Sequence, residues 1–450
     1  MRVGLLIDTG STWTKGLAVD LDAGRLLART QHPTTLAEGL MAGVRAVLAE
    51  LDRAHAGEIV FRAATSSAAG GLRVAAIGLV PALTGQAARQ ASLGAGARVV
   101  FSGNFQLAAA EIAALRAAQP DIVLLAGGTD GGNREVIVRN AGLLAGAGLD
   151  ATVVVAGNKS AREEVCAILG AAGMDWRVAD NVLPEIDTLD VGAAQEAIRA
   201  VFLERIVVAR GIEELREWAG GRLLPTPRAV LDAAQFLAGA VAGFGTLALV
   251  DIGGATTDVH SIGGSDPAEG TLLRGLREPH AKRTVEGDLG LRVSAVAATQ
   301  ALGAEVLSRH LGGSPEELLD RARQLTAATA TLDAQEDFDR VLGIAAVAEA
   351  LRRHAGRLEQ SPIDHRTWFQ AGKDLRDAGA VIASGGVFAA RADAAGLIAA
   401  ALEAARRSDR LVPRAAQAWV DRDYVMFAVG LLADAHPHAA LGLARHSLGC

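Results

Sequence analysis

The chain has 450 residues, half of them hydrophobic and only 4% aromatic, and it carries a net charge of −7. This length exceeds one ordinary hydrophobic core and suits two lobes. No run of Lys or Arg stands out, which argues against nucleic acid and anionic membranes as partners. The two cysteines, Cys166 and Cys450, form no CxxC pair, so a disulfide framework, a zinc site or a cysteine-bound iron–sulfur cluster is not expected.

The first predicted element is an apolar strand from Val3 to Ile7. It runs into a turn of small residues, Asp8-Thr9-Gly10-Ser11-Thr12-Trp13-Thr14-Lys15, and then into a second short strand at residues 16–19. Because the chain starts directly with this strand, no signal peptide is expected and a cytoplasmic location is predicted.

The residue types of this first turn suit a phosphate chain. Gly10 lets the backbone approach a phosphate closely, and hydroxyl donors come from Ser11, Thr12 and Thr14. Mg²⁺ prefers carboxylate and phosphate oxygens, so Asp8 at the strand end is a candidate to hold its water shell. Lys15 offers a positive charge for the β- and γ-phosphates.

Residues 1–225 are predicted to form the first lobe. Short apolar strands alternate with helices here, which indicates a parallel sheet with helices on both faces. The strands are expected at 59–64, 73–76, 99–101, 122–126 and 152–156, and the helices at 36–51, 82–91, 107–117, 133–140, 160–169 and 193–208. Pro225-Thr226-Pro227 marks the expected boundary between the lobes.

A second glycine-rich loop lies inside this lobe, at Gly127-Gly128-Thr129-Asp130-Gly131-Gly132-Asn133. It ends a predicted strand and opens a helix. Asp130 or Asn133 is expected to cap that helix, whose N-terminus would attract an anion.

Residues 226–450 are predicted to form the second lobe, which repeats the first motif. A helix at 228–241 and a strand at 247–250 lead to Asp251-Ile252-Gly253-Gly254-Ala255-Thr256-Thr257-Asp258 and a strand at 259–262. Aligned without a gap, both turns share the Asp, the Gly two residues on and a Thr in the seventh place. Residues 230–250 are apolar enough for a membrane check, but Asp232 and Gln235 interrupt them, so no span is predicted.

The duplicated turns predict a clasp that holds a phosphate chain and Mg²⁺ from two sides. Asp251 is the second candidate metal ligand. The phosphate-binding backbone and hydroxyls of this turn would be those of Gly253, Gly254, Ala255, Thr256 and Thr257. Residues 291–360 are expected to be almost wholly helical, and helices at 393–406, 424–433 and 439–445 close the chain.

Four segments resemble the ATPase superfamily that shares the fold of actin, the heat-shock chaperones and hexokinase. These are the two turns, the segment Thr284-Val285-Glu286-Gly287-Asp288-Leu289-Gly290, and the strand with its Gly-Gly turn at Val381-Ile382-Ala383-Ser384-Gly385-Gly386-Val387-Phe388. The resemblance implies an α/β fold of two ribonuclease H-like lobes with ATP and Mg²⁺ in the cleft between them.

Further site residues follow from this resemblance. Ser384, Gly385 and Gly386 would lie against the adenosine, and Glu286, Gly287 and Asp288 would face the ribose or metal-bound water. Asp130 would orient the attacking water or hydroxyl. Each acid also has a simpler interpretation: Asp130 as a turn residue, and Glu286 and Asp288 as acids at the start of a helix.

A narrower resemblance is carried by Ala64-Thr65-Ser66-Ser67-Ala68-Ala69-Gly70-Gly71-Leu72, Ala156-Gly157-Asn158-Lys159, Leu223-Leu224-Pro225-Thr226-Pro227 and residues 278–290, with the second turn. Together they look like the MutL-type accessory proteins of adenosylcobalamin-dependent glutamate mutase (methylaspartate mutase). The resemblance implies a reactivating chaperone, a slow Mg²⁺-dependent ATPase that helps the mutase release damaged cobalamin.

Two other functions stay open: a kinase acting on a small metabolite on the same fold, and a non-catalytic ATP-binding scaffold. Lys282 and Arg283 are expected on a solvated face, with contact to phosphate or the partner as the alternative. His260 and His280 lack metal-ligand spacing and are expected to be structural or surface residues.

Overall fold

The computed structural model describes residues 1–10, 12–34, 40–67, 72–202, 204, 213–267, 270–327, 337–364 and 366–450. Ser11 lies outside the described residues, as do parts of the helices expected at 36–51 and 193–208. The chain forms two compact units. Unit 1 comprises Met1–Ala69, Glu214–Leu272 and His280–Cys450, and unit 2 comprises Gly70–Glu213 and Leu273–Pro279.

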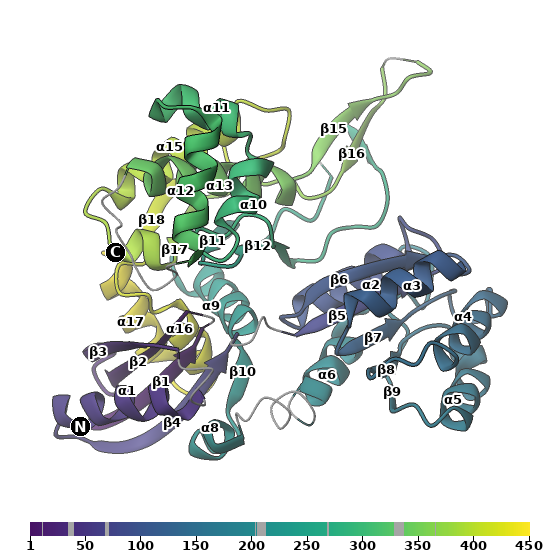
Figure 1. The fold of residues 1–450 in the computed structure, drawn as a ribbon, viewed down its shortest axis with the longest axis horizontal. Helices are drawn as coiled ribbons and strands as arrows, with labels where there is room; N and C mark the ends of the chain where they lie inside the picture. Colours follow the sequence, from purple (N-terminus) through teal and green to yellow (C-terminus); the bar gives the residue numbers. More distant parts are fainter. Residues whose placement is uncertain are drawn as a thin grey trace. The chain divides into compact units, whose positions relative to one another are not determined.

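The first sheet of unit 1 is built around the hairpin that carries the first turn. Its strands are β1 (Arg2–Thr9), β2 (Trp13–Asp20), β3 (Arg25–Pro33), β4 (Glu58–Ser66) and β10 (Leu223–Pro225), in the order β10-β4-β1-β2-β3. β1, β2 and β3 are antiparallel neighbours, whereas β4 runs parallel to β1 and to β10. Helix α1 (Leu40–Ala54) packs on β2 and β3 (Figure 1).

The second sheet of unit 1 repeats this topology. Its strands are β11 (Leu247–Ile252), β12 (Thr257–Ile262), β14 (Ala281–Glu286), β17 (Ala380–Ser384) and β18 (Gln417–Val420), in the order β14-β12-β11-β17-β18. The first three are antiparallel neighbours, and β17 runs parallel to β11 and β18. This duplicated ribonuclease H-like arrangement confirms the fold class expected from the sequence.

Helices pack against both faces of the second sheet. One core holds α10 (Ala295–Ala301), α11 (Ala304–Leu311), α12 (Pro315–Ala327), α13 (Asp337–His354), α14 (Gly386–Ala389) and α15 (Ala394–Arg406). The other is shared by both sheets and holds α9 (Thr226–Ala240), α16 (Met426–Leu432) and α17 (Pro437–Leu448). In the described part of 291–360, which omits 328–336, the expected helices are present as α10 to α13. After α13, β15 (Arg357–Gln360) and β16 (Trp368–Ala371) form a hairpin, with β13 (Thr271–Leu273) as a third strand.

Helices α9 and α16 cross at a glycine. A Cβ on Gly430 would lie 1.8 Å from the carbonyl oxygen of Ala229, so a larger residue would push the two helices apart.

The apolar stretch at 230–250 forms α9 and then β11, as predicted. Among the described residues, no helix is both long and apolar enough to cross a membrane.

Unit 2 is a parallel sheet inserted between β4 and β10. Its strands are β5 (Arg73–Gly78), β6 (Arg98–Asn104), β7 (Ile122–Leu125), β8 (Thr152–Val155) and β9 (Trp176–Val178), in the order β6-β5-β7-β8-β9. Its helices are α2 (Thr84–Gly94), α3 (Ala109–Ala118), α4 (Glu135–Ala145), η2 (Lys159–Ala161), α5 (Arg162–Ala171) and α6 (Gly192–Val201), and α8 (Glu213–Trp218) follows.

The parallel sheet predicted from the βαβ rhythm is therefore present, but the strand at 59–64 is not part of it. That strand is β4 and pairs with β1, because its apolar residues fit beside the N-terminal hairpin. The two duplicated sheets lie in residues 2–225 and 247–420, yet they share one core and one compact unit. The lobe boundary at 225 and 226 stays a prediction.

Candidate functional site

The two Asp-x-Gly turns have the same internal bonding. In the first, the N–H of Gly10 donates to the carbonyl of Trp13 at 3.0 Å, and in the second the N–H of Gly253 donates to that of Thr256 at 2.8 Å. Each turn joins two antiparallel strands and follows an aspartate at the end of the first. The duplication visible in the sequence is thus also a duplication of backbone geometry.

The tips of the two turns lie against each other. A Cβ built on Gly254 would lie 3.2 Å from both the hydroxyl oxygen of Thr12 and the Cβ of Arg292, so the second turn closely approaches the first. Strands far apart in the sequence therefore deliver Asp8 and Asp251 to neighbouring turns of unit 1.

Asp8 is held rigidly. Only 1% of its surface is exposed. Its Oδ1 accepts hydrogen bonds from Thr65 on β4 at 2.8 Å and from Thr226, the first residue of α9, at 2.7 Å. The two hydroxyls fix the orientation of the carboxylate, and both belong to segments that carried the narrower family resemblance.

Asp251 has a different environment. Among the described residues its carboxylate has no hydrogen-bond partner. Burial raises its pKa to about 7, with the nearby Asp258 and Asp8 carboxylates adding to the rise and Lys15 opposing it. A divalent cation would relieve this concentration of negative charge, so the pair Asp8 and Asp251 fits the predicted Mg²⁺.

The carboxylate of Asp258 is already neutralised within the protein. It pairs with Arg283 at 2.5 Å and accepts a hydrogen bond from Thr256 at 3.0 Å. The expectation that Arg283 lies on a solvated face is wrong: its side chain is 3% exposed, because β14 places it directly beside β12. Lys282 donates to the carbonyl of His354 at 3.1 Å.

Some predicted phosphate donors are used elsewhere. The hydroxyls of Thr14 and Thr257 are fully buried and bond to Thr34 at 3.2 Å and to the carbonyl of Leu289 at 2.8 Å. These two residues brace the turns rather than offer donors to a ligand. Thr12 is partly exposed at the tip.

Lys15 stands opposite Asp8 in the β1–β2 register, so both side chains lie on the same face of the sheet. Burial lowers its pKa, against the raising effect of Asp8 and Asp251. Its ammonium lies 3.1 Å from the centre of the Tyr424 ring. Tyr424 was missed by the sequence analysis, although it follows a strand and opens a helix.

Asp421 was missed as well. It is fully buried between β18 and α16 and accepts hydrogen bonds from Ser384 at 2.9 Å and Ser447 at 2.7 Å. The signal was available, because all three acids lie at strand ends: Asp421 directly follows β18, and Asp8 and Asp251 are the second-to-last residues of β1 and β11. Burial raises the pKa of its carboxyl group, while the hydrogen bonds lower it.

The predicted adenosine turn packs directly on the second phosphate turn. Gly385 has φ +116°, and a Cβ there would lie 2.2 Å from the carbonyl oxygen of Ile252, so no other residue fits. A Cβ on Gly386 would meet nothing within 4 Å. Ser384 lies opposite Asp251 in the register of β11 and β17.

The segment after β14 supports the second turn from outside. Leu291 and Arg292 donate backbone N–H groups to the carbonyls of Gly253 and Gly254 at 3.0 and 2.8 Å. Glu286 and Asp288 both pair with Arg353 of α13, at 2.9 and 2.8 Å. These ion pairs favour a structural role for the two acids.

Asp130 lies in unit 2, on the loop between β7 and α4. Its Oδ1 accepts hydrogen bonds from the backbone of Lys159 and from the Asn181 amide, both at 3.0 Å. Burial opposes ionisation, but these hydrogen bonds outweigh it and lower the pKa. The carboxylate ties together the loops after β7, β8 and β9, which favours its interpretation as a turn residue.

The surroundings of the two histidines differ. His260 is fully buried, and no group of three or more potential ligands occurs among the described residues. The backbone carbonyl of His280 accepts a hydrogen bond from Lys373 at 2.8 Å.

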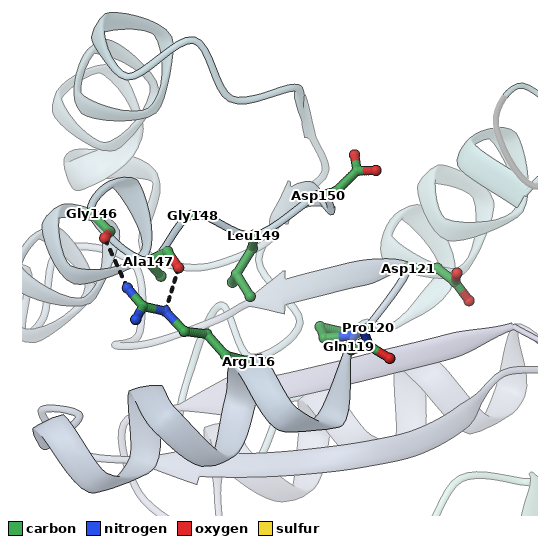
Figure 2. A pocket seen from close by; sticks show the side chains of 9 residues that line it. All are labelled: Arg116, Gln119, Pro120, Asp121, Gly146, Ala147, Gly148, Leu149 and Asp150. Carbon is green, nitrogen blue, oxygen red and sulfur yellow. Dashed lines mark hydrogen bonds between the residues drawn. The ribbon is translucent and has the colours of Figure 1, made fainter.

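An open pocket of about 650 Å³ lies at the amino ends of β7 and β8 in unit 2. Figure 2 shows Arg116 reaching across it to the carbonyls of Gly146 and Ala147. The guanidinium thereby caps the end of α4, and none of the predicted site residues lines the pocket.

Two ribonuclease H-like sheets, each ending in an Asp-x-Gly turn, define a protein of the actin, heat-shock chaperone and hexokinase-like fold class. The MutL protein family matches residues 4–448, and the chain belongs to this family. A relative described as Protein MutL, from Clostridium tetanomorphum, is 40% identical over 461 residues, covering 100% of this chain and 99% of the relative.

Solved structures share the fold only distantly. A nucleotide-free acetone carboxylase is 14% identical with a TM-score of 0.40, covering 96% of this chain and 70% of that one. The activator of 2-hydroxyisocaproyl-CoA dehydratase from Clostridium difficile, with bound ADPNP, is 10% identical with a TM-score of 0.29, covering 99% and 94%. Similarities at this level add nothing to what the sheet order shows.

Proposed function

We propose that this protein is a Mg²⁺-dependent ATPase that serves as the accessory, reactivating protein of an adenosylcobalamin-dependent mutase, with glutamate mutase as the client. The observation that supports nucleotide binding best is the contact between the two equivalent Asp-x-Gly turns at Gly254 and Thr12. Family membership supports the accessory role.

Each predicted site residue has a role in binding Mg²⁺ or the nucleotide in this proposal. Asp8, fixed by Thr65 and Thr226, and Asp251, with its unpaired carboxylate, hold the water shell of Mg²⁺. When bound, Mg²⁺ neutralises phosphate charge and orients the phosphate chain. Lys15 adds a charge at the β- and γ-phosphates. The adenosine lies along Ser384, Gly385 and Gly386, and the backbone of Gly253, Gly254, Ala255 and Gly287 borders the phosphates and ribose.

ATP binding closes the two lobes, and hydrolysis allows them to reopen. A mutase that prefers one of these states binds tightly to that state and dissociates from the other. This cycle would allow damaged cobalamin to leave the mutase. Slow turnover suits such a timing device. Helices α9 and α16 cross closely at Gly430 within the core that the two sheets share.

The kinase and scaffold alternatives have less support. A kinase needs a base facing the γ-phosphate, and the carboxylate of Asp130 is already bonded to Lys159 and Asn181. A non-catalytic scaffold would hold Mg·ATP through the same two carboxylates but release no phosphate, so ATP turnover separates it from the proposed ATPase.

The test is ATP turnover, with and without cobalamin-inactivated glutamate mutase, while corrinoid release is followed on a desalting column. We expect slow Mg²⁺-dependent hydrolysis and ATP-dependent corrinoid release. Asp8→Ala and Asp251→Ala should each abolish both. Normal hydrolysis by both variants would refute the clasp, and hydrolysis without corrinoid release would exclude glutamate mutase as the client.

A further inference from the structure

Lys15 is held by an aromatic ring. Its ammonium lies 3.1 Å from the centre of the Tyr424 ring, well within the range of a cation–π attraction. Among the described residues, Lys15 has no hydrogen-bond or ion-pair partner, although Asp8, Asp251 and Asp421 attract its charge and Arg29 repels it. Because the lysine side chain is flexible, its ammonium would be expected to pair with one of these carboxylates unless another group attracts it.

Tyr424 is itself anchored more firmly than a residue at the start of a helix usually is. It has φ 54°, which is costly for a residue with a side chain and persists only where the surroundings impose it. The constraint comes from Asp421, which accepts the N–H groups of Val425 at 2.9 Å and Met426 at 3.2 Å. The same carboxylate bonds to Ser384, so the backbone that follows Tyr424 is tied to the strand beside Asp251.

The type of attraction matters for what Lys15 is free to do. A carboxylate partner would use N–H donors of the ammonium and would itself be lost to Mg²⁺. A ring face attracts the charge without occupying a carboxylate, and so leaves Asp8 and Asp251 for Mg²⁺ and the N–H donors that point away from the ring for phosphate oxygens.

We propose that Tyr424 is a positioning residue for Lys15, held in place by Asp421, and that it aims the ammonium at the polyphosphate of the bound nucleotide. This inference rests on the proposed function. Tyr424 touches no reacting atom in this scheme and acts only through Lys15, so its effect must vanish when Lys15 is neutralised.

The test uses the full chain and measures Kd for Mg·ATP and for AMP by calorimetry. Tyr424→Leu should weaken Mg·ATP binding about tenfold and leave AMP binding unchanged, since AMP lacks the β- and γ-phosphates. Tyr424→Phe, which keeps the ring, should bind Mg·ATP like the wild type. In a Lys15→Gln background, Tyr424→Leu should cause no further loss.

Three results would overturn the inference: equal loss of Mg·ATP and AMP, additive losses in the double variant, or a Phe variant as impaired as the Leu variant. Tyr424→Phe also keeps the inference testable if the Leu variant misfolds, because it removes only the hydroxyl group and keeps the ring. If the wild type itself fails to bind Mg·ATP, the proposed function fails together with this inference. If the wild type binds and the losses are additive, only the role of Tyr424 fails.

Discussion

The ion pair between Arg292 and Asp339 is predicted to be the most sensitive support of the second phosphate turn. Arg292 donates to both carboxylate oxygens, at 2.9 and 2.6 Å, and the two side chains are 4% and 2% exposed. Removing one partner of such a pair leaves an uncompensated charge in the interior. Asp339→Ala should therefore lower the free energy of unfolding by about 3–5 kcal/mol.

An exposed pair provides the matched control. Asp320 and Arg323 lie one turn apart on α12, and both side chains are 60% exposed. Asp320→Ala should cost less than about 0.5 kcal/mol, because solvent screens the interaction. Replacing both buried partners, as Arg292→Met with Asp339→Leu, should recover most of the stability lost by Asp339→Ala.

The assay is urea unfolding followed by tryptophan fluorescence in a Trp176→Phe background. Trp176 is the one tryptophan of the sequence that lies in unit 2, so the remaining four, Trp13, Trp218, Trp368 and Trp419, report on unit 1. The reasoning is refuted if Asp339→Ala costs no more than Asp320→Ala. A double variant as unstable as the single one would show that shape, not charge, makes the pair necessary.

Three further outcomes are expected. Gly385→Ala should abolish nucleotide binding, because the added Cβ would lie 2.2 Å from the carbonyl oxygen of Ile252. Gly386→Ala should bind ATP normally, because its Cβ would meet nothing within 4 Å. Similar Kd values of the two variants for ATP would contradict this prediction. Burial lowers the pKa of both His260 and His354, so the unfolded chain takes up protons below pH 6.5 that the folded chain does not. The two histidines should thus make stability fall below that pH in unfolding experiments, while Asp251, whose pKa is raised to about 7 in the folded chain, opposes the fall. His260→Leu should reduce the fall, and an unchanged pH dependence would exclude His260 as a cause.

Local patterns were enough to predict the two turns and their roles in the fold. An apolar strand, an aspartate and a glycine two residues on specify a hairpin tip through residue type alone, and both turns have the expected hairpin geometry. The stretch at 230–250 was also predictable, since Asp232 and Gln235 break its apolar face. The same reasoning predicted the parallel sheet of unit 2 from its alternating strands and helices.

Other features of the fold and site could not be predicted from the sequence, because they depend on contacts between distant segments. Nothing near residues 59–64 indicates that this strand pairs with β1 rather than with the next strand of the chain. Arg283 looked solvent-exposed because its neighbours are polar, yet β14 places it beside Asp258 in the interior. The resemblance alone could not show which side chains Asp130 contacts, and its hydrogen-bond partners Lys159 and Asn181 come from loops 29 and 51 residues further along the chain.

By itself, the sequence determined a duplicated strand–turn–strand motif, its acids and its family, because hydrophobic spacing and glycine act over a few residues. Tertiary structure decided which acids are available to a cation. Asp8 is fixed by Thr226, 218 residues away, Asp258 is neutralised by Arg283, and Asp421 is taken up by Ser384 and Ser447. A carboxylate's charge and orientation depend on burial and on partners from other strands, and these exist only once the two sheets have packed around their common core.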